Sequence, residues 1–377
     1  MSSQKIILNM ITNEDDPKIV KRCLESVKPL IDAWVICDNG STQEVKDAIC
    51  ESFQDVPGRI YSCDWIDFGT NRTEAIAIAR QFALDYLPGE SCYLFTLDAD
   101  EELILTPDYI LPDFEGLPLL GFIMKLGTVY YPRPNFLSLE HQWRFEDPQH
   151  EELICETQGI KAKLLPGPYI LVKQEGKRSK DPCRYWKDSE TLREAYAKNP
   201  KPRFLFYRAQ ALRGAGMKQA CLEEYRKCIE ANANPEEVWY SKLCVARLLD
   251  EAQAPESEIV MAYLDAHNSR PWRLEALASL TLYWRRLEKH ELAFWACERA
   301  RQIIPSGDTF FAESIWYEGP LEEEFSRNAF LSGHYPEVVE ACRNLLNLPN
   351  LPDDERKRIS KNMIKALDTI EKMKEAT

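Results

Sequence analysis

The stretch YLFTLDADEE, residues 93–102, decides the fold of the first half of the chain. Its first five residues are apolar or favour β-structure, and they predict a buried strand. Four acidic residues follow within the next five positions, so the strand ends in a carboxylate-rich turn. Ligands of parallel α/β sheets bind outside the carboxyl ends of the strands. The stretch therefore predicts both a sheet strand and a polar binding edge.

Three earlier segments also predict strands. Apolar runs occupy residues 5–12, 33–37 and 59–65, and helical patterns separate them at 19–30, 44–53 and 71–87. Strands that alternate with helices indicate the α/β class, with a mostly parallel, Rossmann-like sheet covered by helices. Residues 103–185 contain strand-like pieces at 121–126 and 160–165, and we expect mixed strands and loops there that complete the domain.

The second half of the chain has a different pattern. Its composition turns helical near residue 188, and prolines recur at Pro200, Pro235, Pro271 and Pro305, spaced by 35, 36 and 34 residues. A period near 34 is typical of the two-helix repeat of the tetratricopeptide type. We therefore predict two domains, an α/β domain over 1–187 and an all-α helical-repeat domain over 188–377. Trp239, Trp272, Trp284 and Trp295 are expected either between these helices or on a binding face.

Composition and charge exclude several classes of function. A net charge of −14 disfavours nucleic acid and anionic lipid as partners. No apolar run reaches the roughly 18–20 residues of a membrane span, and the first residues do not resemble a signal peptide. The 12 cysteines include no C-x-x-C pair, so they predict reduced thiols rather than a zinc site. A cytoplasmic location is expected.

The acidic turn predicts a metal site. Asp98 and Asp100 follow the strand one residue apart, and such hard oxygen ligands can hold Mn²⁺ or Mg²⁺ together with phosphate oxygens. A metal there would neutralise a leaving diphosphate. The alternative is a surface acidic turn that caps a helix.

Other polar residues are expected at the same edge. Asn13 and Glu14 follow the first strand, and Asp38 and Asn39 follow the second. Asp38 can accept from a nucleobase or a ribose hydroxyl, or it can bond to its own turn. Arg72 stands near the start of a helix and suits a diphosphate; the alternative is a solvated surface arginine.

The pair His150 and Glu151 predicts a base. Glu151 is the favoured carboxylate for taking a proton from an attacking acceptor, and His150 can complete a metal shell. The alternative is an exposed polar loop. Glu146, Asp147 and Glu152 compete for the role of base.

Four motifs in order resemble the family 2 glycosyltransferases with the GT-A fold: MITNEDD, VICDNGST, NRTEAIAIAR and LFTLDADEEL, which begin at residues 10, 35, 71 and 94. The later repeats resemble the tetratricopeptide-type extension of one branch of that family. The resemblance implies that Asp98 and Asp100 bind the metal, that Asp38 contacts the base and that Arg72 approaches the diphosphate. It likewise matches Asn13 and Glu14 to the N-E pair, and His150 and Glu151 to a His-Glu pair. Thr12 departs from the pattern, since many relatives have Lys there.

These observations together predict a metal-dependent, inverting glycosyltransferase. The donor would be a nucleotide sugar, with UDP-sugar favoured, and the acceptor a sugar, peptide or protein. The repeats would select the acceptor, stabilise the fold or mediate self-association into a homo-oligomer. The alternative is a tetratricopeptide interaction protein with a catalytically inactive front domain. A sugar-phosphate nucleotidyltransferase is disfavoured, because TNEDDPK after the first strand lacks the glycines of a triphosphate loop.

Overall fold

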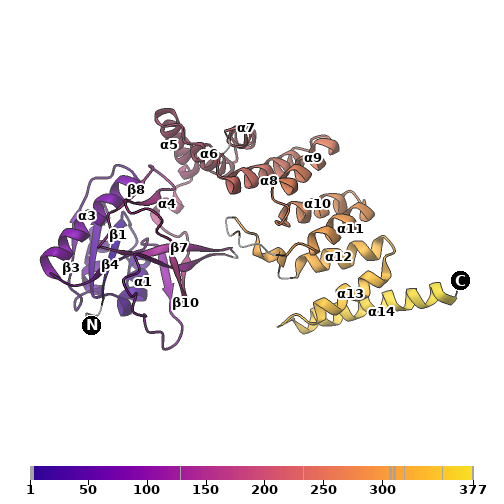
Figure 1. The fold of residues 1–377 in the computed structure, drawn as a ribbon, viewed down its shortest axis with the longest axis horizontal. Helices are drawn as coiled ribbons and strands as arrows, with labels where there is room; N and C mark the ends of the chain where they lie inside the picture. Colours follow the sequence, from indigo (N-terminus) through magenta and orange to yellow (C-terminus); the bar gives the residue numbers. More distant parts are fainter. Residues whose placement is uncertain are drawn as a thin grey trace. The chain divides into compact units, whose positions relative to one another are not determined.

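The computed structural model describes residues 4–127, 129–231, 233–304, 308, 311–317, 319–349 and 351–375 (Figure 1). The chain divides into two compact units, Met1–Gly216 and Met217–Thr377. Pro305, the last of the regularly spaced prolines, lies outside the described residues. The sequence predicts the domain boundary at residues 187 and 188, where the composition turns helical. In the structure the first compact unit extends to Gly216, so it includes the helices at 184–198 and 202–214.

The alternation of strands and helices predicted for the first hundred residues is present. The elements in order are β1 Lys5–Thr12, α1 Pro17–Val27, the 3-10 turn η1 Lys28–Leu30, β2 Ala33–Asp38, α2 Gln43–Ser52, β3 Gly58–Ser62, α3 Phe68–Tyr86 and β4 Cys92–Thr96. Local sequence explains the helix starts: Asp16, Thr42 and Asp67 each cap a helix by accepting from a backbone N–H.

The remaining strands complete a mixed sheet. They are β5 Glu101–Ile104, β6 Leu119–Leu126, β7 Val129–Ser138, β8 Trp143–Glu146, β9 Glu152–Cys155 and β10 Lys163–Val172. The order in the large sheet is β3-β2-β1-β4-β7-β6-β10-β5. The first four strands in this order are parallel, while β7 runs antiparallel to both β4 and β6. In the second half of the sheet β6 and β10 are parallel and β5 is antiparallel to β10, so this half is mixed, and β8 pairs with β9 separately.

Alternating side chains of β1 bury both faces of the sheet. On one face Ile6, Leu8 and Met10 belong to the core that α1 and α2 cover. On the other face Ile7 belongs to the core formed with α3 and with Trp143 of β8. Because successive residues of a strand point to opposite faces, an apolar run such as KIIL requires cover on both sides. The two helix layers supply that cover, and the apolar residues at the strand ends, Ile11, Cys37 and Leu97, are buried as well, so the polar residues of this edge stand directly after a packed core.

Helices follow β10 to the end of the chain. The first unit ends with α4 Lys177–Lys180, α5 Arg184–Lys198 and α6 Pro202–Gly214. The second contains α7 Lys218–Glu230, α8 Pro235–Glu251, α9 Glu256–Ser269, α10 Glu275–Arg286, α11 His290–Arg301, η2 Ser314–Tyr317, α12 Pro320–Leu331, α13 Tyr335–Leu346 and α14 Asp353–Glu375.

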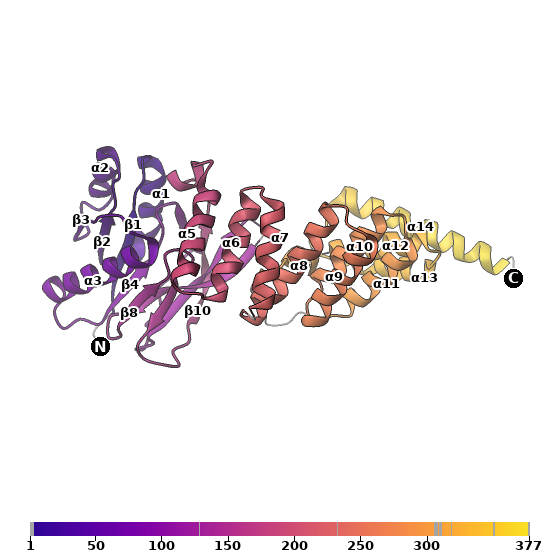
Figure 2. The same ribbon diagram turned by 90° about the horizontal axis from the view of Figure 1, so that it is seen from above.

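The second unit is a helical-repeat array, as its sequence predicts. Each helix from α7 to α14 packs against the next (Figure 2). Pro235 is the first residue of α8, a position that suits proline, whereas Pro271 lies in the turn between α9 and α10. Trp239 and Trp284 are buried between helices, whereas Trp272 and Trp295 are about half exposed.

We predict that Leu24→Ala destabilises the first unit strongly. Leu24 on α1 is fully buried in the core beneath the sheet. The cavity left by such a truncation costs about 2–5 kcal/mol of the free energy of unfolding. Urea denaturation followed by circular dichroism measures this cost. Glu25→Ala on the exposed side of the same helix is the control and should cost less than about 0.5 kcal/mol. Equal losses for both variants would contradict the assigned packing.

Candidate functional site

The predicted polar residues lie at one edge of the sheet. In the register of the parallel strands, Thr12 at the end of β1 pairs with Asp38 at the end of β2. Asn9 of β1 pairs with Thr96 at the end of β4, which places Asp98 two residues beyond that strand. The carboxyl ends of parallel strands are where α/β sheets bind ligands. We call this region, from Asn13 to Asp100 and across to Glu151, the carboxyl edge.

Arg72 joins two acidic residues that are far apart in the sequence. Its Nη2 donates to Oδ1 of Asp98 at 2.6 Å, and its Nε donates to Oε1 of Glu151 at 2.5 Å. The guanidinium also lies 5.8 Å from the ring centre of Phe145. The structure therefore brings together three of the predicted residues through one cation.

The start of α3 holds Arg72 in place. Asn71, its neighbour, is buried and donates to the carbonyl of Asp64, and it accepts from the N–H of Ile66. These bonds fix the first turn of the helix, so the next side chain extends toward the carboxyl edge. Asn71 belongs to the same motif as Arg72, and its role in the structure is to shape the turn.

The charges at this centre stabilise one another. Burial acts to lower the pKa of Arg72, but the carboxylates of Asp98 and Glu151 outweigh it and raise that pKa. Burial acts in the opposite sense on Asp98, where Arg72 and Arg133 outweigh it and lower the pKa. Asp98 is consequently ionised near neutral pH and available as a ligand oxygen.

A second arginine supports Asp98 from β7. Arg133 donates to both carboxylate oxygens of Glu101, at 2.7 and 2.5 Å, and lies 3.9 Å from Asp98. Glu101 is buried and accepts from the backbone N–H of Asp98 at 3.0 Å. The sequence predicts Glu101 in a turn, whereas it begins β5. Arg133 was missed because residues 103–150 contain no motif that marks it.

Asp100 and Glu14 lie against the loop that leads into α4. Oδ2 of Asp100 accepts from the N–H of Gly176 at 3.3 Å, and both carboxylate oxygens of Glu14 accept from the N–H of Lys177 at 2.9 Å. A Cβ on Gly176 would lie 2.6 Å from Oε1 of Glu14 and 3.1 Å from Oδ2 of Asp100. Only glycine allows this approach without displacing a carboxylate.

Both carboxyl groups have raised pKa values. Burial is the main cause for each, and the negative charge of Asp98 adds to the effect at Asp100. The carboxylates of Asp98 and Asp100, one residue apart, thus repel each other, and the neighbouring positive charges do not fully offset that repulsion at Asp100. That imbalance fits a divalent cation, which would relieve it.

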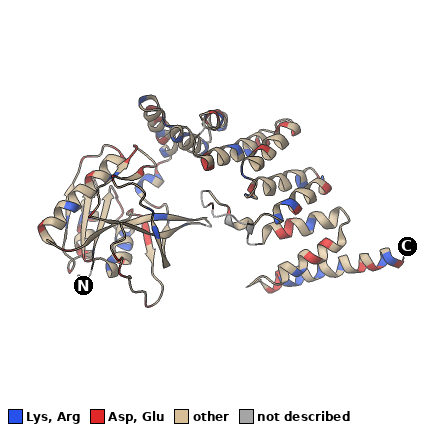
Figure 3. Cartoon of the chain, in the orientation of Figure 1, with Lys and Arg blue, Asp and Glu red and all other residues tan. Residues whose placement is uncertain are grey.

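The short helix α4 adds basic residues that the sequence analysis missed. Its sequence is KRSK, and Figure 3 shows the Lys and Arg of this segment. Lys177 pairs with Asp15 at 2.9 Å, and Arg178 lies 4.8 Å from the ring centre of Phe68. The positive charge of Arg178 also contributes to the lowered pKa of Asp98. Three basic residues within four positions, Lys177, Arg178 and Lys180, were the signal available in the sequence.

Asp38 is the most buried carboxylate at the end of a parallel strand. Its Oδ1 accepts from the N–H of Ser41 at 2.8 Å, and its Oδ2 pairs with Lys46 at 2.9 Å. Burial raises its pKa, but Lys46 and Ser41 outweigh that effect, so the pKa lies below its usual value. Next to it, Asn39 donates to the carbonyl of Cys63 at 3.0 Å, which ties the ends of β2 and β3 together. Asp38 therefore bonds to its own turn, as the sequence alternative allowed.

Asn13, after the end of β1, is exposed, and its side-chain oxygen accepts from Nζ of Lys177 at 3.2 Å.

The His-Glu pair divides between two environments. Glu151 is mostly buried beside Arg72. The ring of His150 stacks on Tyr207 of α6, with centroids 4.0 Å apart and planes 9° apart. The backbone of His150 is in the left-handed region, with φ of 53°. The side chains of His150 and Glu151 therefore do not follow the alternation of an extended strand. The stacking removes part of the ring from water and lowers the pKa of His150, although the residue as a whole is exposed, as the sequence alternative of an exposed loop predicted.

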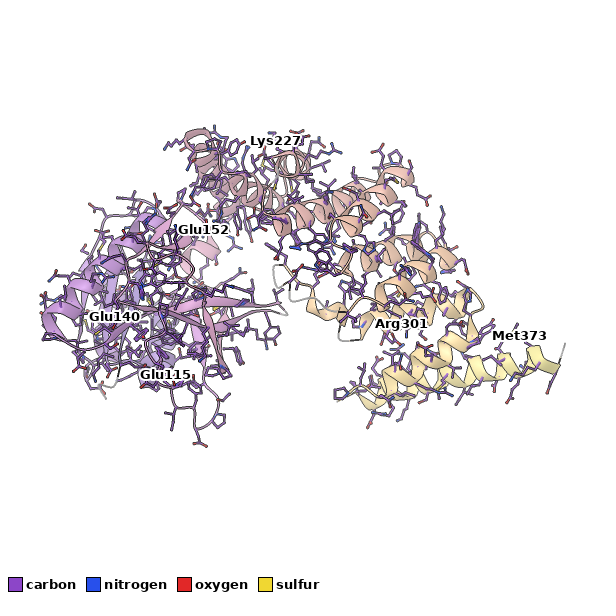
Figure 4. The ribbon with its side chains drawn as sticks, viewed as in Figure 1. Glu115, Glu140, Glu152, Lys227, Arg301 and Met373 are labelled. Carbon is purple, nitrogen blue, oxygen red and sulfur yellow. The ribbon has the colours of Figure 1, made fainter. Side chains whose placement is uncertain are left out.

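The competing bases bind positive residues near α6. Asp147 pairs with Lys201 at 2.6 Å, and Glu146 pairs with Lys201 at 3.4 Å. Glu152, which begins β9 and is labelled in Figure 4, pairs with Arg203. These three carboxylates hold the loop onto the helical pair α5 and α6. Among the four, Glu151 is the one whose ion pair leads to Asp98 through Arg72.

Asp98, Asp100 and His150 do not form a three-ligand centre. Within the residues that the structure describes, no group of three or more His, Cys, Asp or Glu side chains is arranged to hold a metal ion. A metal that also binds phosphate oxygens needs fewer protein ligands. Asp98 and Asp100, one residue apart, suit that arrangement, while the ring of His150 stacks on Tyr207.

Comparisons with known proteins support the repeat half. No protein-family model matches the chain. A TPR repeat-containing protein of Synechococcus elongatus is 30% identical over 145 residues, which cover 36% of this chain and 32% of that protein. The chain thus spans about a third of the length of this relative. The match supports a tetratricopeptide-type region in this chain.

Solved structures give a weaker likeness. A TPR protein of Thermus thermophilus is 14% identical, with a TM-score of 0.32, over 48% of this chain and 91% of its own. The C-terminal part of a TPR repeat-containing protein of Cytophaga hutchinsonii is 14% identical, with a TM-score of 0.36, over 49% and 75%. The repeat assignment itself rests on the helix order and on the sequence relative. Every helix in the described ranges is too short or too polar to cross a bilayer.

We predict that Asp38→Asn lowers stability in a pH-dependent way. The pKa of Asp38 is depressed in the folded chain, so its contribution is present above the unfolded pKa of about 3.9 and is lost as pH falls through the folded pKa. At pH 7 the variant should lose about 1–3 kcal/mol of the free energy of unfolding, and the difference should narrow below about pH 4. Denaturant titration across pH measures this.

Asp47→Asn is the matched control, since Asp47 lies on the exposed side of α2 close to Lys46 in sequence. It should change stability little at any of these pH values. A loss for Asp38→Asn that stays constant down to pH 3 would show that the lost ion pair is not its cause.

Proposed function

We propose that the first unit is a metal-dependent, inverting glycosyltransferase of the GT-A type that uses a nucleotide-sugar donor. The observation that carries the proposal is the bridge from Asp98 through Arg72 to Glu151, at the carboxyl edge of a partly parallel sheet. It joins a metal-binding candidate to a base candidate in one place. The resemblance of four ordered motifs to family 2 glycosyltransferases supports the same assignment.

The donor would bind along the strand ends. Asp38, which is held by Lys46 and the amide of Ser41, would accept from a uracil N–H or a ribose hydroxyl through a remaining lone pair. Asp98 and Asp100 would hold Mn²⁺ or Mg²⁺, which when bound supplies charge neutralisation for the diphosphate. Arg72, Lys177 and Arg178 are the basic side chains of this edge and would bind diphosphate oxygens.

Glu151 would act as the base. Arg72 donates to its Oε1, and its Oε2 would take the proton of the attacking acceptor group. The acceptor atom then forms a bond to the anomeric carbon while the bond from that carbon to the diphosphate oxygen breaks. The nucleoside diphosphate leaves with the electron pair, and attack from the opposite side inverts the anomeric centre. A sugar, peptide or protein acceptor is compatible with this chemistry.

The second candidate is an interaction protein. The relative found by sequence is named as a TPR repeat-containing protein, and such repeats stack to form extended binding surfaces. This finding favours the interaction function more directly than sugar transfer. In that case the carboxyl edge would be catalytically inactive, and its ion pairs would only stabilise the folded first unit. Self-association through the repeats belongs to the same candidate.

We predict that one nucleotide sugar is hydrolysed slowly, and only with Mn²⁺ or Mg²⁺. Water would replace the acceptor, so the expected product of a panel assay is free sugar plus nucleoside diphosphate, abolished by a chelator. Asp100→Ala should abolish the reaction, and Arg72→Ala should slow it on the order of 100-fold or more, as expected for a lost charge-stabilising donor. Chromatographic detection of the nucleoside diphosphate measures both.

Asp113→Ala is the control, because Asp113 is an exposed acid in the loop before β6. Calorimetry with the same donors should follow any negative result. No hydrolysis and no binding at millimolar donor with metal would reject the enzyme and favour the interaction protein.

A further inference from the structure

A tryptophan is exposed in the loop between β3 and α3, which spans residues 63–67. The side chain of Trp65 is 47% exposed, and that of its neighbour Ile66 is 64% exposed. The aromatic side chains of the adjoining strands differ in this respect, because Trp34 on β2 and Tyr93 on β4 are buried in the core. Trp65 therefore presents an aromatic surface to solvent beside the carboxyl edge.

The loop that carries Trp65 begins at the turn that holds Asp38. The N–H of Cys63 donates to the carbonyl of Asp38 at 2.9 Å, and the side chain of Asn39 donates to the carbonyl of Cys63 at 3.0 Å. Trp65 follows Cys63 by two residues. The indole therefore belongs to a segment that is bonded directly to the strand end proposed to bind the nucleoside.

The backbone on both sides of Trp65 is fixed by one buried side chain. Asn71 of α3 donates to the carbonyl of Asp64 at 2.8 Å and accepts from the N–H of Ile66 at 2.8 Å. Asp67 then caps α3. Because this segment is ordered by the chain itself, an aromatic ring that packs on Trp65 costs little further conformational entropy.

The indole ring itself rests on a neighbouring phenylalanine. The rings of Trp65 and Phe68 lie 4.8 Å apart, with their planes at 83°. Phe68 in turn lies 4.8 Å from the guanidinium of Arg178, which pairs with Asp188 at 2.6 Å. Since the two ring planes are nearly perpendicular, Phe68 covers only part of the indole, in agreement with its exposed fraction.

The position of Trp65 selects one part of the proposed donor. A nucleotide sugar that lies along the strand ends would place its base at the Asp38 end, its diphosphate near Arg72 and its transferred sugar near Glu151. Every nucleobase has a flat π-face that stacks on aromatic side chains, whereas a diphosphate has none. The base is therefore the group that matches both the place and the chemistry of the indole.

We propose that Trp65 is a stacking residue for the nucleobase of the donor. The inference rests on the nucleotide-sugar function proposed above and adds to it a side chain that determines affinity for the nucleoside. Stacking depends on the ring face and tolerates different bases, whereas hydrogen bonds to Asp38 depend on the edge of the base. Loss of the indole should therefore weaken the binding of a nucleoside diphosphate and leave the binding of its diphosphate group unchanged.

The test measures binding by calorimetry to the full-length chain with Mn²⁺. A panel of UDP, dTDP, GDP, CDP and ADP first identifies the nucleoside diphosphate that the wild type binds most tightly. Trp65→Ala should raise the Kd for that ligand about ten-fold or more, as expected for a lost stack between an aromatic side chain and a base. The Kd for pyrophosphate, which has no base, should stay the same.

Tyr86→Ala is the matched control. Tyr86 is an exposed ring, 57% accessible, at the opposite end of α3, where it stacks on Phe82. Its loss should change neither Kd. Trp65→Leu keeps an apolar contact with Phe68 and replaces Trp65→Ala if circular dichroism shows that the alanine variant is unfolded.

Three results would overturn the proposal. Equal affinity of the wild type and the Trp65 variants for the nucleoside diphosphate would reject the stacking while leaving the nucleotide site in place. An equal loss of affinity for pyrophosphate would show that the substitution disturbs the whole carboxyl edge and that no stack was removed. Failure of the wild type to bind any member of the panel at millimolar concentration would reject the donor site, and the stacking with it.

Discussion

One guanidinium holds the candidate site together. Arg72 links Asp98, at the end of a central strand, to Glu151, which comes 53 residues later (151 − 98) in a loop after β8. Without this cation the two carboxylates would sit in a partly buried region with fewer compensating charges, a costly arrangement. Asn71 sets the turn that carries Arg72, and Arg133 with Glu101 secures Asp98 from the other side. The positions of strand, helix and loop at this edge thus depend on one ion-pair network.

The sequence was sufficient to predict the first four strands and three helices, because continuous apolar runs and amphipathic helices both have clear periods. It also placed Asp38 and Asp98 at strand ends, where the structure has them. In the second half of the sheet it predicted strands at 121–126, which lie in β6, and at 160–165, which overlap the start of β10. It did not predict β7 or the order of pairing, because β6, β7 and β10 combine exposed and buried residues and pair with strands distant in the sequence. Arg133 on β7 was missed for the same reason, whereas the basic residues of α4 were visible in the sequence but matched no motif. His150, predicted as a metal ligand, stacks on Tyr207 in the structure.

The helical half was easier to predict in kind than in detail. Pro235 begins α8, and a relative named for its TPR repeats supports that region. The long connection between α11 and α12 was not predicted, because a proline period describes the repeats and not an insertion between them. In the structure Glu313 of this connection binds Arg247 of α8, and Phe311 stacks on Tyr240 of the same helix.

The tight packing at Gly176 has an evolutionary consequence. Position 176 tolerates no side chain without moving Glu14 off the Lys177 amide or crowding Asp100. Homologous chains that keep carboxylates at the positions of Glu14 and Asp100 should therefore keep glycine here, while chains that have replaced either acid are free to carry alanine or serine. Glycine and the two acids should thus change together across homologous sequences.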